Sequence, residues 1–177
     1  MKSILFGLTF LAALAAAPSA NAEIYDGKPF YAGVKTGFAL MDYDGGPVDP
    51  VAVVLQGKVG FHTPCSKRHY LCAIGGYVGP QVAAFGIDDV SAYQASMAAG
   101  VELFLRDSSV YFEAGPSVFN VEGTDLARGY MAGVGSDVRI EGPVGMGAEY
   151  QHYELITVDT NELVTGHSWS FTFNVIW

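Results

Sequence analysis

Two short segments contain residue types that serve in hydrolysis. One holds His152 and Glu154, and the other is the adjacent pair His167 and Ser168. A histidine activates a serine nucleophile only when the two side chains lie within hydrogen-bonding distance. Neighbouring residues of a β-strand point to opposite faces, so a strand at this position would keep His167 away from Ser168. We therefore expect no catalytic residue in this chain.

The two cysteines, Cys65 and Cys72, lie close together in the sequence. A thiol pair in an exported chain meets an oxidising compartment, so we expect a disulfide between them. A metal site with the nearby His62 and His69 is the alternative. Its spacing matches no standard zinc motif, so the sequence predicts neither a bound metal nor a cofactor.

Seven charged residues lie inside segments that otherwise alternate between apolar and small or polar residues. Their charges nearly balance, and they fall on the face opposite the bulky apolar side chains. Charges so few cannot solvate a whole exterior, but they can pair in the interior of a narrow barrel, which side chains fill. We expect a hydrogen-bonded ion network there, formed by Lys35, Lys58, Glu102, Glu113, Asp137, Arg139 and Glu149.

Segments with a period of two, separated by turn-forming residues, are typical of β-strands. The sequence contains eight of them, each near or above the ~9 to 11 residues with which a tilted strand crosses a membrane. We predict strands over 30–41, 51–62, 71–85, 91–105, 110–120, 128–141, 144–153 and 167–177, with a long loop over 154–166.

The last segment shows the two faces most clearly. One face is apolar and largely aromatic, and the other carries Ser, Thr and Asn with a single Ile. Such a strand suits hydrocarbon on one side and water or hydrogen-bonding groups on the other. The apolar series consists of Trp169, Phe171, Phe173, Val175 and Trp177.

The N-terminal residues have the features of an export signal. Lys2 precedes an apolar run, and a small-x-small pattern ends at Ala22. The run is shorter than the ~20 residues of a membrane-spanning helix, which argues against an uncleaved anchor. We expect residues 1–22 to be a cleaved signal peptide and residues 23–177 to form one barrel domain.

The composition excludes several classes of function. The chain of 177 residues is 50% hydrophobic and only 15% charged, with a formal net charge of −9. A nucleic-acid binder ordinarily carries a high pI and clustered basic residues, so no nucleic-acid partner is expected. A lipocalin-like periplasmic barrel, with its apolar face inside and charges outside, is the soluble alternative, but its exterior would need many more charges.

The export signal, the glycine-rich alternating strands and the terminal aromatic series resemble the small outer-membrane β-barrels of Gram-negative bacteria, of the OmpA and OmpX type. The resemblance implies an all-β, antiparallel, eight-stranded up-and-down transmembrane barrel. It also implies an outer-membrane location with both termini in the periplasm. The expected partners are membrane lipid, lipopolysaccharide and the barrel-assembly machinery, which reads the terminal series; we expect a monomer.

Aromatic residues of such barrels gather at the two water interfaces. We expect an outer girdle that includes Phe85, Tyr93, Phe119, Tyr130, Tyr150 and Trp169. The segment around His152 is also similar in placement to the lipid A 3-O-deacylase family, which uses a His-x-Ser pair. Glu154 stands where that serine should be, and Glu162 could serve as the orienting acid, although its spacing does not support that role. We therefore expect a structural or surface-interaction protein with a plugged lumen, with a lipid A-modifying enzyme as the alternative.

Overall fold

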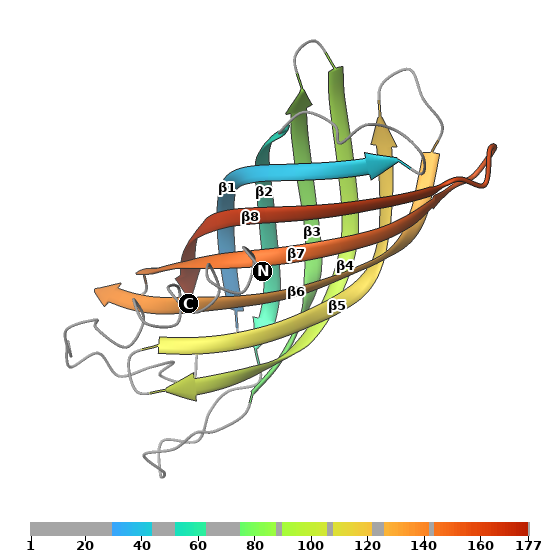
Figure 1. Cartoon of the computed structure of the whole chain (residues 1–177). Helices are drawn as coiled ribbons and strands as arrows, with labels where there is room; N and C mark the ends of the chain where they lie inside the picture. Colours follow the sequence, from blue (N-terminus) through green and yellow to red (C-terminus); the bar gives the residue numbers. More distant parts are fainter. Residues whose placement is uncertain are drawn as a thin grey trace, which may run out of the picture.

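The computed structural model describes residues 30–43, 52–62, 75–87, 90–105, 108–121, 126–141 and 144–176. These residues form eight antiparallel strands that close into one barrel, in which each strand pairs with its neighbours in the sequence. The last strand pairs with the first, so that Tyr31 lies opposite Ile176. Figure 1 shows the strands running obliquely around the barrel. This is the all-β, up-and-down transmembrane architecture expected from the alternation.

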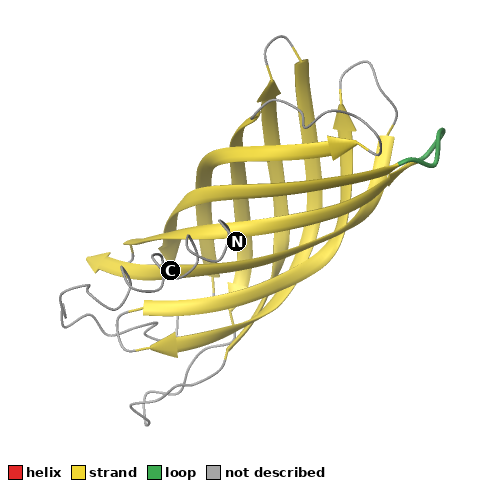
Figure 2. Cartoon of the chain, in the orientation of Figure 1, coloured by secondary structure: helices red, strands yellow, loops and turns green. Residues whose placement is uncertain are grey.

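The strands are long, as a membrane-crossing barrel requires. Within the described residues no helix is long and apolar enough to cross a membrane, and Figure 2 shows strands joined to a single described hairpin loop. The strands are β1 (Phe30–Tyr43), β2 (Ala52–His62), β3 (Gly75–Ile87), β4 (Val90–Leu105), β5 (Ser108–Val121), β6 (Leu126–Glu141), β7 (Val144–Thr157) and β8 (Leu163–Ile176).

The β7–β8 hairpin differs from its prediction. The expected loop over 154–166 is wrong, because β7 continues to Thr157 and β8 begins at Leu163. The predicted strand ends where polar residues appear on its outward face. Polarity there marks the edge of the membrane, whereas the hydrogen-bond ladder extends beyond that edge and pairs Leu155 with Val164.

Side chains facing outward form an apolar band, as lipid contact requires. Val53, Val82 and Phe171 are about two-thirds exposed, at 65%, 61% and 66%. Apolar groups at such exposure would be costly in water, at roughly 25 cal/mol per Å². A lipocalin-like barrel would have the opposite arrangement, with apolar side chains around an internal ligand. The exterior of this barrel is therefore built for hydrocarbon.

The interior has two layers along its axis. We call the end with Phe30 and Ile176 the terminal end and the opposite end the distal end. Polar side chains fill the middle of the interior. The distal part contains an apolar cluster of buried residues, among them Val54, Phe85, Phe119, Met131, Tyr153, Leu155 and Val164.

Candidate functional site

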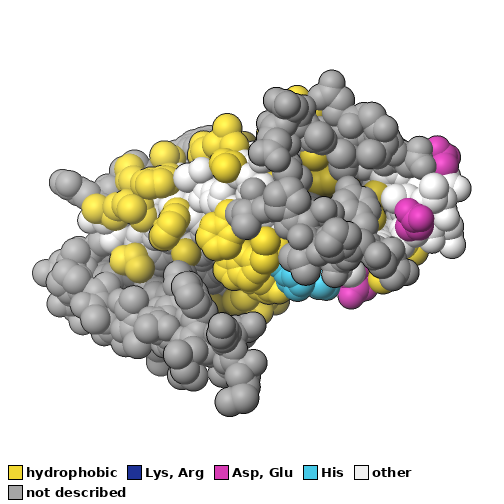
Figure 3. Space-filling model, turned by 45° about the horizontal axis from the view of Figure 1, so that its top comes forward, with side chains coloured by type: hydrophobic (Ala, Val, Ile, Leu, Met, Phe, Trp, Pro, Cys, Tyr) yellow, Lys and Arg dark blue, Asp and Glu magenta, His cyan; other side chains and the backbone are white. Residues whose placement is uncertain are grey.

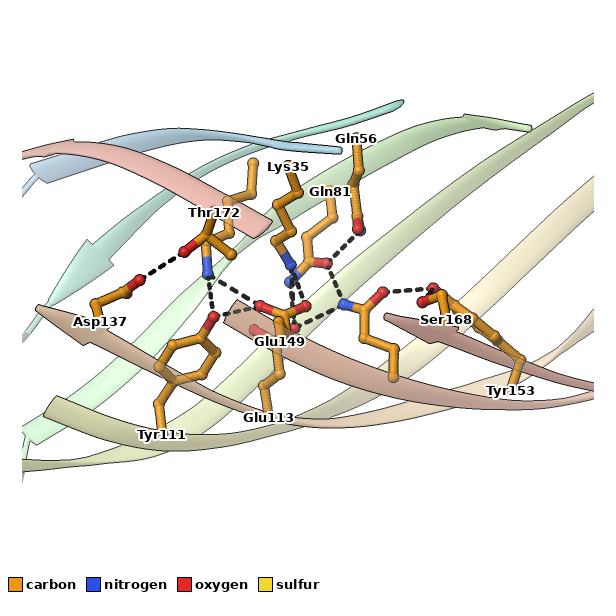
Figure 4. Close-up of polar contacts among 12 residues, drawn as sticks. Lys35, Gln56, Gln81, Tyr111, Glu113, Asp137, Glu149, Tyr153, Ser168 and Thr172 are labelled. Carbon is orange, nitrogen blue, oxygen red and sulfur yellow. Dashed lines mark hydrogen bonds and ion pairs between the residues drawn. The ribbon is translucent and has the colours of Figure 1, made fainter. Parts of the chain in front are cut away.

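The centre of the interior holds two lysines and two glutamates that meet across the lumen. Lys35 comes from β1 and Lys58 from β2, whereas Glu113 comes from β5 and Glu149 from β7. All four side chains are buried. They face inward because each has the same parity in its strand as its buried polar neighbours. We call these four residues the lumen quartet (Figure 4).

Glu149 is the anionic centre of the quartet. It accepts a short hydrogen bond from Lys35 and another from the Tyr111 hydroxyl. Its second oxygen lies 3.4 Å from the ammonium of Lys58. That ammonium also lies 4.4 Å from the centre of the Tyr111 ring, within cation–π range. One carboxylate therefore forms ion pairs with two ammonium groups and accepts a hydrogen bond from a phenol.

Glu113 is held mainly by amides. Its Oε1 accepts hydrogen bonds from Gln81 Nε2 at 2.8 Å and from Gln151 Nε2 at 2.9 Å, and it lies 3.7 Å from Lys35 Nζ. Gln81 in turn accepts hydrogen bonds from Gln56 at 2.7 Å and from Gln151 at 3.0 Å. The amide side chains thus connect the quartet to β3 and extend the hydrogen-bond network toward the distal end.

The network continues at both of its edges. Tyr153 donates to Gln151, and its hydroxyl lies 3.1 Å from the Ser168 oxygen. On the other side, Thr172 donates to Asp137 at 2.7 Å. These side-chain contacts in the interior therefore involve residues of β1, β2, β3, β5, β6, β7 and β8.

The seven predicted ionic residues fall into two groups. Lys35, Lys58, Glu113 and Glu149 meet in the quartet. Asp137 is bonded to Thr172 and is only partly buried, as is Arg139. Glu102 is buried, with 2% of its surface exposed. Asp137, Glu102 and Arg139 lie toward the terminal end, where the register brings Asp137 opposite Ser109.

Several members of the network were not predicted from the sequence. The prediction considered charge alone and so omitted Gln56, Gln81, Gln151 and Tyr111. Period-two spacing was the signal that could have found three of them. Gln56 precedes Lys58 by two positions, Tyr111 precedes Glu113 by two, and Gln151 follows Glu149 by two, so each shares the inward face of a predicted charge.

Gly135 makes room for the tyrosine of this network. A Cβ built at position 135 would overlap the Tyr111 ring, with Cε2 only 2.7 Å away. The side chain of Tyr111 therefore lies over the backbone of β6, and its hydroxyl reaches Glu149. Glycine at position 135 allows the ring to lie flat within a narrow lumen.

Two aromatic residues expected in the outer girdle lie inside the barrel. Phe85 and Phe119 are only 2% and 3% exposed, and their ring centres are 5.1 Å apart. Their parity explains the correction, because Phe85 shares the inward face with Gln81 and Ala83. Tyr93 and Tyr130 do face outward, at 58% and 48% exposure.

The residues with catalytic potential lie on different faces. Ser168 is buried in the lumen beside Tyr153, whereas His167 points outward and is half-buried. His152 is also outward, and its Nε2 lies 3.3 Å from Glu154 Oε1. Glu162 is exposed in the hairpin loop. The His167–Ser168 pair therefore cannot transfer a proton directly.

The terminal apolar series lies on the outward face of β8. Phe171, Phe173 and Val175 are exposed to the exterior, and Trp169 stacks on Phe38 of β1 with ring centres 5.3 Å apart. Trp177 lies outside the described residues, and so do Cys65 and Cys72 with their predicted disulfide.

A closed barrel of strands with an apolar exterior and buried polar side chains inside is the architecture of an integral outer-membrane β-barrel. Solved structures with this fold include the following two. Neisserial surface protein A aligns with a TM-score of 0.64 at 14% identity, over 84% of this chain and 97% of that one. Ail, the attachment invasion locus protein of Yersinia pestis, aligns with a TM-score of 0.56 at 13% identity, over 83% of this chain and 98% of that one.

The sequence itself assigns the family. Residues 6–176 match the outer membrane protein beta-barrel domain, so the chain belongs to that family and resides in the outer membrane. No curated protein matches the chain in sequence.

Proposed function

We propose that this protein is a structural barrel of the outer membrane whose lumen is closed to ions and solutes by its own side chains. The observation that carries the proposal is the lumen quartet, in which Lys35 pairs with both Glu113 and Glu149 across the interior. The ion pairs and the hydrogen bonds of amide side chains that join opposite walls support the absence of a continuous aqueous path. The protein then acts through the wall of the barrel and its distal end, and it does not transport solutes.

A surface-interaction role accompanies the structural one. The described part of the distal hairpin presents Asp159, Asn161 and Glu162 to solvent. A closed barrel holds such a hairpin at a fixed height above the lipid. We propose that the distal end lies at the cell surface, that the monomer is surrounded by lipopolysaccharide, and that its contacts serve envelope integrity or host and phage contact.

Catalysis is not part of this proposal. The deacylase-like segment carries Glu154 in place of a serine, and the histidine next to Ser168 points away from it. A carboxylate beside His152 can orient or charge the imidazole, but it supplies no hydroxyl for acyl transfer. Overexpression of the protein is expected to leave the mass of lipid A unchanged, and a deacylated product would contradict this.

Export and assembly complete the proposal. Cleavage after Ala22 gives a mature chain beginning at Glu23, which N-terminal sequencing of the membrane-bound protein tests directly. Recovery of Met1 in the membrane fraction would show an uncleaved anchor instead. Outer-membrane fractionation with a mobility shift on boiling is expected for the folded barrel, and insertion by the barrel-assembly machinery is expected to depend on the terminal series.

Conductance across a planar lipid bilayer tests the closed lumen. The full mature chain is expected to give no steady channel. The double variant Glu113→Ala and Glu149→Ala removes both carboxylates of the quartet and is expected to give measurable openings. The double variant Thr36→Ala and Thr165→Ala, which changes side chains outside the lumen, serves as the control. Steady conductance by the unmodified chain would overturn the proposal.

A further inference from the structure

The outward face of the β7–β8 hairpin carries two histidines directly opposite each other. His152 and His167 are register partners on adjacent strands. Their ring centres are 4.8 Å apart, and their Nδ1 atoms are separated by 3.4 Å. They lie outside the lumen, because the adjacent Gln151 and Ser168 point into it. The lumen network and this pair are therefore separate sites.

The pair lies where the barrel leaves the membrane. The next outward pair toward the terminal end is Tyr150 with Trp169, and the next toward the distal end is Glu154 with Thr165. Aromatic rings occupy the membrane–water interface, whereas carboxylates are costly in hydrocarbon. Figure 3 shows histidine side chains between apolar surface and acidic side chains. Ions dissolved in water can therefore reach the imidazoles.

The separation of the two nitrogens suits a metal ion better than a hydrogen bond. Good N–H acceptor distances run from about 2.7 to 3.2 Å, so the 3.4 Å between the rings allows only a weak hydrogen bond, as does the 3.3 Å between His152 Nε2 and Glu154. Two nitrogens bound to one tetrahedral zinc ion, each at about 2.0 to 2.1 Å, lie about 3.3 Å apart. The two Nδ1 atoms therefore already have the spacing of a chelating pair.

The surroundings of His152 favour its Nδ1 as a ligand. Its other nitrogen, Nε2, lies 3.3 Å from the Glu154 carboxylate. Glu154 is held in turn by a hydrogen bond from the Tyr130 hydroxyl. A carboxylate that accepts the second ring N–H is the usual support of metal-binding histidines, since it fixes the tautomer and raises ligand basicity. In the tautomer with its proton on Nε2, that N–H faces Glu154 and Nδ1 can coordinate a metal ion.

Tyr150 hydrogen-bonds one of the two nitrogens. Its hydroxyl lies 2.6 Å from Nδ1 of His167, so a metal ion bound to that nitrogen replaces this hydrogen bond. On the neighbouring strands, Leu40 of β1 lies opposite His167 and Ala132 of β6 lies opposite His152. Neither residue carries a positive charge. Within the described residues no group of three His, Cys, Asp or Glu converges to hold a metal. The site therefore offers two imidazoles, with the remaining positions left to water.

We propose that His152 and His167 bind a divalent transition-metal ion of the zinc and copper class at the membrane–water boundary of the barrel. Imidazole nitrogen suits these ions, whereas calcium and magnesium require oxygen ligands. A site with two protein nitrogens and open positions binds reversibly. Because it bridges β7 and β8, an ion bound there would clamp the hairpin that projects from the membrane.

Titration calorimetry with Zn²⁺ on the full mature chain, folded in detergent, tests the site. We expect one ion per barrel at neutral pH, with weaker binding at acidic pH because protons compete for the nitrogens. His152→Ala and His167→Ala are each expected to abolish this binding. Glu154→Gln is expected to weaken it by about tenfold or more. Two results would overturn the proposal. One is no binding by the unmodified chain, and the other is binding by both histidine variants as tight as that of the unmodified chain.

Two controls separate this site from others. The double variant His62→Ala and His69→Ala retains the binding if the outward pair is responsible, and loses it if the metal sits near the cysteines. Spectra of the Cu²⁺-loaded, unmodified chain need no variant to fold. Electron paramagnetic resonance is expected to show two coordinated imidazole nitrogens, and coordination by oxygen alone would contradict the assignment.

Discussion

Lys35 of β1 and Glu149 of β7 form an ion pair inside the barrel with both side chains fully buried. The two residues lie far apart in the sequence and on strands that are not neighbours. Closure of the barrel alone brings them together. A buried pair is weak evidence for net stability, because desolvation offsets the attraction, but removal of one partner leaves a buried charge unpaired.

Glu149→Gln should destabilise the barrel strongly. It removes the carboxylate shared by two lysines, and breaking a buried pair in this way costs about 3 to 5 kcal/mol. Urea unfolding in lipid vesicles, followed by tryptophan fluorescence, measures the loss. The matched control is Glu162→Gln in the exposed hairpin loop, which should stay within about 0.5 kcal/mol of the parent. Equal effects of the two variants would argue against the quartet.

Gly135→Ala should disturb the interior through Tyr111. The added methyl group overlaps the ring, which must move and weaken its bond to Glu149. Overpacking of this kind costs about 1 to 3 kcal/mol. Gly145→Ala is the control, because its Cβ would meet only the Val138 carbonyl at an ordinary 3.6 Å. The same unfolding assay distinguishes them, and a harmless Gly135→Ala would contradict the observed packing.

Asn161→Val should destabilise the β7–β8 hairpin. Asn161 has a φ of 57°, in the left-handed region that a β-branched residue rarely adopts. The loop is closed by Thr157, whose hydroxyl accepts from the Glu162 N–H at 2.8 Å. Strain of about 1 to 2 kcal/mol is expected for valine. Asn161→Gly should be tolerated, and hydrogen exchange of the hairpin amides reports local opening in both variants.

Trp177→Ser should impair assembly in cells. Trp177 follows directly after β8 in the sequence, and the proposed recognition by the assembly machinery depends on the terminal series. The amount of heat-modifiable protein in the outer membrane should fall, while refolding of the purified chain in detergent should continue. Val158→Ser in the exposed hairpin is the control. Normal assembly of the Trp177 variant would remove the terminal series from this role.

Much of the architecture is readable in the sequence because strand side chains alternate with a period of two. The outward series of β8 and the inward charges Lys35, Lys58, Glu113 and Glu149 follow from that rule and from the cost of placing charge in lipid. The family and the number of strands follow from the same pattern repeated along the chain.

Only the tertiary structure decides which inward residues meet. Barrel closure and register place Gln81 and Gln151 on the same oxygen of Glu113, which no local pattern specifies. Register likewise sets His152 opposite His167, although a loop separates them in the sequence. It also brings the inward rings of Phe85 and Phe119 together in the distal core. Local alternation thus determines which face a residue occupies, whereas the residues it contacts depend on hydrogen-bonded register and on closure of the sheet.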